Sequence, residues 1–234
     1  MARQKGLYFI GRMGNVVGST WKGIPYLRYM PDKINQSEAT KQSSANMALA
    51  SRISAAFRKS FGPQLPQPKD RAIQNRFTGA IKKWLQTKPF EQTLPSTIVP
   101  YLTGFDFNEV SPVQARFPVP VTLQENAQQP LQLQIASFVP EQNITAPAYT
   151  KTVNLKIGIA NCAMDSCSIK EYYFDEVSFL YNNETIPERL ISLPYLVDEG
   201  NIILALISLQ YYTKTGGITN LRWLPCGVVA GYLK

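Results

Sequence analysis

The side chains in this sequence that could carry out chemistry are carboxylates, lysines, tyrosines and cysteines, because the chain contains no histidine. Without histidine, neither a Ser-His-Asp nor a Cys-His nucleophile system can form. Acid–base catalysis would fall to carboxylates, lysine or tyrosine. The pairs Asp175-Glu176 and Asp198-Glu199 are candidates for a carboxylate site, but they read more simply as exposed loop charges. The sequence therefore predicts no enzyme and no catalytic residue.

Cofactor and metal motifs are also missing from the sequence. The run from Gly14 to Thr20 has the wrong spacing for a phosphate-binding loop and lacks its lysine. The three cysteines are Cys162, Cys167 and Cys226, and their spacing is not that of zinc knuckles. Cys162 and Cys167 flank a predicted hairpin turn, so a disulfide across that turn is geometrically allowed. Buried free thiols are the alternative. We expect no cofactor and no metal.

Charge is segregated along the chain. Residues 1–90 carry 16 basic and three acidic side chains, a net charge of +13, whereas residues 91–234 carry eight basic and 13 acidic side chains, a net charge of −5. A basic half can bind nucleic acid. It can equally dock on an acidic half of the same chain or of the next subunit, and a head-to-tail contact generates rings or filaments. Two solvated surfaces of opposite sign are the simplest reading.

The first thirty residues predict a small glycine-punctuated β element, with Trp21 and Tyr26 as its packing residues. Strands this short need an edge to pair with, which another subunit could supply. The predicted assembly interface comprises Gly11, Gly14, Val16, Val17, Gly18, Trp21 and Tyr26.

Two helices are predicted next. The first starts at Ser37-Glu38, with a capping hydroxyl and an acid in its first turn, and ends near Ser60 before Gly62-Pro63. The second starts near Asp70 and ends before Pro89. The two apolar stripes, spaced at i, i+4, i+7 and i+8, are Leu49, Ile53, Ala56 and Phe57, then Ile73, Phe77, Ala80, Ile81, Trp84 and Leu85. We expect an antiparallel pair beside the N-terminal strands. Its face for nucleic acid or an acidic partner comprises Arg52, Arg58, Lys59, Arg71, Arg76, Lys82 and Lys83.

The remaining chain reads as strands, because apolar and polar residues alternate in several segments. The expected strands are 98–102, 114–123, 131–139, 153–160, 169–180, 202–213 and 226–233. Seven short strands separated by turns favour an immunoglobulin-like β-sandwich. The predicted fold class is therefore α+β, with residues 1–96 forming a β element and helix pair and residues 97–234 forming the sandwich.

A resemblance adds to this interpretation. The pattern from Gly11 to Gly23 (GxxGxVVGxxWKG), Tyr26-x-Arg28-x-x-Pro31 and Thr40-x-Gln42 at a helix start resembles an uncharacterised protein family of the Bacteroidota. An Asn75-to-Ala80 helix segment and the Leu193-Pro194 and Gly200-Asn201-Ile202 pieces correspond more loosely. The resemblance implies an architecture of Gly-rich strands, helices and a sandwich-like half. It implies no reaction.

The sequence thus predicts a non-enzymatic structural subunit that self-assembles, into a filament or a phage-like particle, through its N-terminal strands and complementary charged halves. The alternative is a nucleic-acid-binding protein that uses the basic helix face. A ligand- or carbohydrate-binding module is a third class, and it would show exposed aromatic residues lining a cleft. No apolar run reaches the ~20 residues of a membrane span, and no Sec signal is recognised. We therefore expect a cytoplasmic protein, or one released in a particle.

Overall fold

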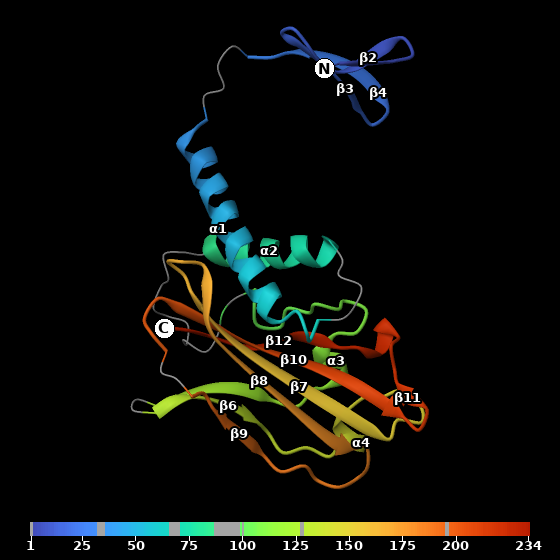
Figure 1. The fold of residues 1–234 in the computed structure, drawn as a ribbon, viewed down its shortest axis with the longest axis vertical. Helices are drawn as coiled ribbons and strands as arrows, with labels where there is room; N and C mark the ends of the chain where they lie inside the picture. Colours follow the sequence, from blue (N-terminus) through green and yellow to red (C-terminus); the bar gives the residue numbers. More distant parts are fainter. Residues whose placement is uncertain are drawn as a thin grey trace. The chain divides into compact units, whose positions relative to one another are not determined.

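Contacts divide the chain into two compact units, Met1–Ser43 and Ser44–Lys234. The computed structural model describes residues 2–31, 36–65, 71–86, 99, 101–126, 129–194 and 197–234 (Figure 1). This division differs from the predicted boundary between residues 96 and 97, which lies outside the described residues. Both predicted helices share a hydrophobic core with the C-terminal strands, and this shared core is why the boundary moves.

The first unit is a four-stranded antiparallel meander. Its strands pair in chain order: β1 (Arg3–Lys5), β2 (Tyr8–Met13), β3 (Val16–Trp21) and β4 (Ile24–Tyr29). Two-residue turns connect them, and the last turn has positive φ at both Lys22 (49°) and Gly23 (83°). Positive φ at both central residues suits the tight turns that match strand twist, so the glycines punctuate the sheet as the sequence predicts.

The second unit contains two antiparallel sheets. In the larger sheet, β10 (Asn201–Thr213) lies between β7 (Thr152–Ala163) on one side and, on the other, β12 (Cys226–Leu233) with β11 (Gly216–Gly217). The outer strand β8 (Ser168–Leu180) pairs with β7. The smaller sheet has the order β5 (Val121–Asn126), β6 (Gln129–Ile135), β9 (Arg189–Ser192).

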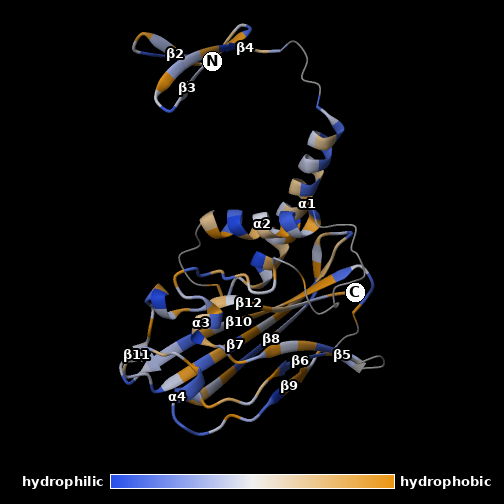
Figure 2. Ribbon diagram, turned by 180° about the vertical axis from the view of Figure 1, so that it is seen from behind, coloured by the Kyte–Doolittle hydropathy of each residue, from blue (hydrophilic) through white to orange (hydrophobic). Residues whose placement is uncertain are grey.

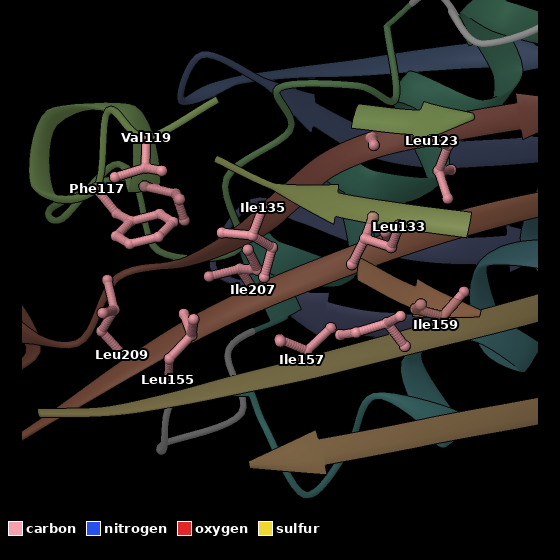
Figure 3. Close-up of a cluster of buried hydrophobic side chains, with 14 of the residues drawn as sticks. Phe117, Val119, Leu123, Leu133, Ile135, Leu155, Ile157, Ile159, Ile207 and Leu209 are labelled. Carbon is pink, nitrogen blue, oxygen red and sulfur yellow. The ribbon is translucent and has the colours of Figure 1, made fainter. Parts of the chain in front are cut away.

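One hydrophobic core lies between the two sheets. Figure 3 shows Leu133 and Ile135 of the smaller sheet lying over Leu155, Ile157 and Ile207 of the larger sheet. All five side chains are at most 2% exposed. The predicted period-two alternation is present here, because in β7 the odd-numbered residues from 153 to 159 belong to this core.

The opposite face of the larger sheet is covered by helices α1 (Glu38–Ser60) and α2 (Arg71–Gln86). Figure 2 shows the larger sheet between these helices and the smaller sheet. A second core therefore joins Phe57 and Phe77 to Leu204 and Leu206 of β10. Because both its faces are covered, β10 reads as a continuous apolar run rather than an alternating one. Three short helical turns, α3 (Val113–Arg116), α4 (Pro140–Asn143) and η1 (Leu221–Trp223), lie in the connections.

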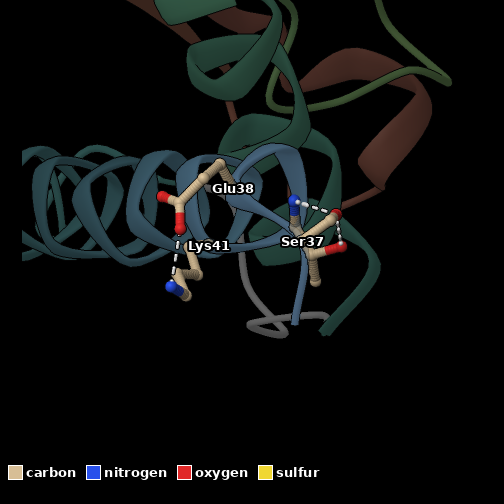
Figure 4. Close-up of polar contacts among 4 residues, drawn as sticks. Ser37, Glu38 and Lys41 are labelled. Atoms are coloured by element: carbon tan, nitrogen blue, oxygen red, sulfur yellow. Dashed lines mark hydrogen bonds and ion pairs between the residues drawn. The ribbon is translucent and has the colours of Figure 1, made fainter. Parts of the chain in front are cut away.

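The start of α1 agrees with the predicted cap. The Ser37 Oγ accepts a hydrogen bond from the Thr40 backbone N–H at 3.2 Å, and Glu38 pairs with Lys41 at 2.7 Å (Figure 4). A side-chain oxygen here satisfies one of the N–H groups that a helix start leaves without a partner.

The predicted arrangement of the helices is wrong. Figure 1 shows α2 running across α1 rather than alongside it. The two helices meet where the Thr78 hydroxyl donates to Ser54 Oγ at 3.0 Å, and where the Phe57 and Phe77 rings contact edge to face. Small side chains at the crossing let the helices approach while each lies on the sheet. Both helices pack on the larger sheet of the second unit.

Two predicted strands are also corrected. Of the segment 98–102, the described residues Val99, Tyr101 and Leu102 form no strand, and Tyr101 begins a turn with φ of 65°. The segment 114–123 instead continues α3 and enters β5 only at Val121. Strand β9 was not predicted. The α+β class is confirmed, and the immunoglobulin-like type of the sandwich stays a prediction.

Candidate assembly surface

The N-terminal sheet exposes an unusual amount of apolar side chain. Seven of the sixteen exposed large hydrophobic residues in the described chain lie between Leu7 and Tyr29. Trp21 is 69% exposed, Ile24 68%, Leu27 61% and Tyr29 80%. Neither hydrophobic core in the described part of the chain includes a residue from this unit. The sheet therefore presents its large side chains to solvent instead of burying them.

Strand register places these side chains on both faces of the sheet. Residues directly opposite each other in an antiparallel pair lie on the same face. Trp21 pairs with Ile24, and Tyr26 follows two residues later on that face. Leu27 and Tyr29 lie on the other face, where Tyr29 is opposite Val16. Each face of the β3–β4 hairpin thus carries its own apolar patch.

The structure brings all seven predicted interface residues into this one sheet, although their roles differ. Gly14 forms a turn with φ of 59°, and Val16 and Val17 are half-buried. Gly18 is buried, because the Phe9 carbonyl and ring lie directly over it. Gly11 pairs with Gly18 in the neighbouring strand. These residues shape the sheet, whereas exposed side chains such as Trp21 and Tyr26 form its surface.

The predicted packing role of Trp21 and Tyr26 is wrong. Both are exposed, at 69% and 41%, because a single four-stranded meander has no interior of its own for them. Their exposure strengthens their assignment to an interface, since Trp and Tyr are enriched there.

Strand β4 forms one edge of the sheet. In the described chain it pairs only with β3, and all six of its residues are exposed. Every second residue of an edge strand presents an unpaired N–H and C=O to solvent. Pro25 fits this position, because proline is tolerated in edge strands.

The predicted basic face is divided by the structure. Arg76 of α2 contacts the segment 105–109. It forms an ion pair with Glu109 at 2.9 Å, donates to the Asp106 and Phe107 carbonyls at 3.1 and 3.4 Å, and lies over the Phe105 ring. These contacts occupy Arg76 within the fold and leave little of it for phosphate.

The other basic residues lie more openly. Arg58 donates from Nε to Ser54 Oγ at 3.3 Å, and partial burial lowers the pKa of its guanidinium. Arg52, Lys59 and Lys83 are exposed, and Lys82 is half-buried. The side chain of Arg71 lies outside the described residues. The structure thus leaves a smaller basic surface than the sequence predicts.

A groove of about 620 Å³ runs between α2 and the segment 101–112. Arg76, Lys83 and Glu109 line it together with Tyr101, which is 53% exposed. Its lining includes the aromatic residues Tyr101 and Phe105, the kind of side chain that a ligand-binding module would place in a cleft. A smaller hollow of about 260 Å³ lies beside Gln64, a residue that no sequence motif marks.

The cysteines form no disulfide. Cys162, Cys167 and Cys226 are free and buried, so of the two alternatives the structure has buried thiols and not the geometrically allowed Cys162–Cys167 bridge. Burial, with small additions from Cys167 and Asp165, raises the pKa of the Cys162 thiol to about 12. The Cys226 thiol has a raised pKa for the same main reason. Thiols held protonated in this way act as small apolar core side chains.

Among the described residues, no group of three or more acids or cysteines is placed to hold a metal ion. The described helices include none that is long and apolar enough to cross a membrane. The chain matches no protein-family model, no curated protein and no solved structure. The resemblance to the Bacteroidota family therefore stays a prediction.

Proposed function

We propose that this protein is a non-enzymatic structural subunit that self-associates through its N-terminal sheet. The observation that carries the proposal is the exposure of Trp21, Ile24, Leu27 and Tyr29 on a sheet that buries no core of its own. Contiguous exposed apolar surface marks interaction sites in soluble proteins. Burial of each such side chain in an interface contributes roughly 1.5–3 kcal/mol.

The edge of the same sheet supports the proposal. An isolated two-stranded hairpin is at best marginally stable in water, and a larger sheet gains independent stability when its hydrophobic face is packed. A partner that covers the patches and pairs with β4 would stabilise the sheet while it joins two subunits. An assembly built by repetition of one such contact would be a filament or a closed particle.

The test compares two triple variants of the full chain. The first is Trp21→Ser, Ile24→Thr and Leu27→Ser in the N-terminal sheet. The matched control removes three exposed apolar side chains from the second unit by Val110→Ser, Tyr149→Ser and Leu221→Ser. We expect the first variant to sediment as a monomer and the control to assemble like the unaltered chain. If the first variant assembles at the same protein concentration as the unaltered chain, the proposal is rejected.

Nucleic-acid binding is the second candidate, and the observation that favours it is the exposed group Arg52, Lys59 and Lys83. No salt bridge to a described carboxylate is present at any of the three. Binding through such charges predicts an affinity for single- or double-stranded DNA that falls steeply between 50 and about 200 mM salt. Assembly that survives nuclease treatment would separate the first proposal from this one.

A further inference from the structure

The outer strand of the larger sheet is a long free edge. In the described chain, the backbone of β8 pairs only with β7. After a bulge at Lys170, pairing is regular over residues 171–180. This stretch contains no proline, and no described helix or loop hydrogen-bonds along it. Natural sheets usually shorten, cover or interrupt such an edge, because it is a template for another strand.

Apolar side chains accompany this edge. Phe174 is 46% exposed, Tyr172 37% and Leu180 61%. These even-numbered residues share one face of the strand. Tyr172 also contacts the ring of Phe61, so it belongs partly to the fold, whereas Phe174 is the aromatic residue at the middle of the free stretch. The edge therefore offers both backbone groups and apolar surface.

The edge is acidic and the N-terminal unit is basic. Strand β8 contains three acids and one lysine, a net charge of −2, whereas residues 1–43 contain seven basic and two acidic side chains, a net charge of +5. Asp175 pairs with Arg189 at 2.6 Å. Glu171 and Glu176 accept hydrogen bonds from Asn161 and Asn154 but have no cation partner among the described residues. Two oriented carboxylates thus remain for a basic partner.

We propose that this edge of β8 receives strand β4 of a second copy of the chain, which extends the larger sheet. This inference rests on the proposed function, because it names the surface that the N-terminal sheet binds. Strand β4 has six residues, which fit within the ten regularly paired residues of β8. Arg28 and Tyr26 share one face of β4, so Arg28 supplies a cation for Glu176 and Tyr26 supplies an apolar partner for Phe174, which lies on the same face of β8 as Glu176.

Pairing of β8 with β8 of another copy is disfavoured. A two-fold antiparallel pairing near the middle of residues 171–180 would be centred on Asp175 or on Glu176, so that acid would face its own copy and like charges would be opposite each other. The contact between β4 and β8 is heterologous instead, because each copy uses a different surface on each neighbour. A heterologous contact repeats head to tail and yields an open filament or a ring.

The test uses two full-length variants and their mixture. Tyr26→Asp places an anion on the donor strand, facing the acidic edge, and Phe174→Lys places a cation on the receiving edge, facing Arg28. Tyr149→Lys is the matched control, since it changes an exposed aromatic residue in a loop of the same unit. Molar mass is measured by light scattering, and circular dichroism checks that each variant is folded.

We expect each of the first two variants to lose at least tenfold in mean assembly mass, with Tyr149→Lys unchanged. A 1:1 mixture of the two variants retains one intact donor and one intact acceptor, so it should form a heterodimer of two chains and stop there. If Tyr26→Asp prevents assembly but Phe174→Lys does not, the inference is overturned and the proposed function stands. If neither variant affects assembly, both fail.

Discussion

The substitution Gly18→Ala tests whether the N-terminal sheet must be intact for assembly. An added Cβ at Gly18 would lie 2.0 Å from the Phe9 carbonyl oxygen, whereas ordinary contact begins at 3.4 Å. The obstacle is backbone, so β2 must move by more than 1 Å relative to β3. Hydrogen bonds of 2.7–3.2 Å do not tolerate such a shift. We expect a cost of about 1–3 kcal/mol, as for other overpacked sites.

This cost translates into a measurable loss of amide protection. One tenfold change corresponds to about 1.4 kcal/mol, so hydrogen exchange in β2 and β3 should accelerate roughly fivefold to hundredfold. The unit from Ser44 onward should exchange as before, and assembly should be lost. Gly14→Asn is the control, because Gly14 has a positive φ that asparagine tolerates and nothing lies within 4 Å of its added Cβ. Unchanged protection and assembly in Gly18→Ala would refute this reasoning.

Two further predictions concern the second unit. Ser54→Ala and Thr78→Val each remove one partner of the buried hydrogen bond at the helix crossing, and each should lower the free energy of unfolding by about 1–2 kcal/mol. In urea unfolding, the double variant should lose about 1 kcal/mol less than the sum of the two single losses. Strict additivity of the two losses would contradict the contact. Burial raises the pKa of the Cys162 thiol from 9.0 to about 12. The unfolded chain therefore loses this proton first, so stability should be independent of Cys162 below about pH 9 and fall by up to ~1.4 kcal/mol per pH unit between pH 9 and 12. Cys162→Ala should flatten that fall, and an unchanged pH profile would contradict the assignment.

The sequence predicts the elements whose hydrophobic period is strong. The stripe of the second helix places Phe77, Ile81 and Trp84 correctly in the core, because a 3.6-residue period fixes one face. Alternation likewise identifies the core-facing residues of β6 and β7. Strand β9 escapes prediction because it has four residues, of which only Ile191 is buried.

Arrangement in space was harder to predict than the elements themselves. A periodic stripe shows which face of a helix is buried but not the angle at which two helices meet, so the crossing at Ser54 and Thr78 could not be foreseen. Large aromatic residues usually pack, which is the basis of the prediction for Trp21, yet Trp21 is 69% exposed on its sheet. The free edge of β8 depends on strand order, which local sequence does not determine.

The most direct test of the central claim is the molar mass of the unaltered protein in solution. It is measured by light scattering after nuclease treatment, at low and at high salt, and the same samples are viewed by negative-stain microscopy. The account predicts large regular assemblies that survive nuclease, with mass that falls at high salt because the +5 N-terminal unit and the acidic edge of β8 are screened from each other. A monodisperse monomer at all concentrations and salt levels would contradict it.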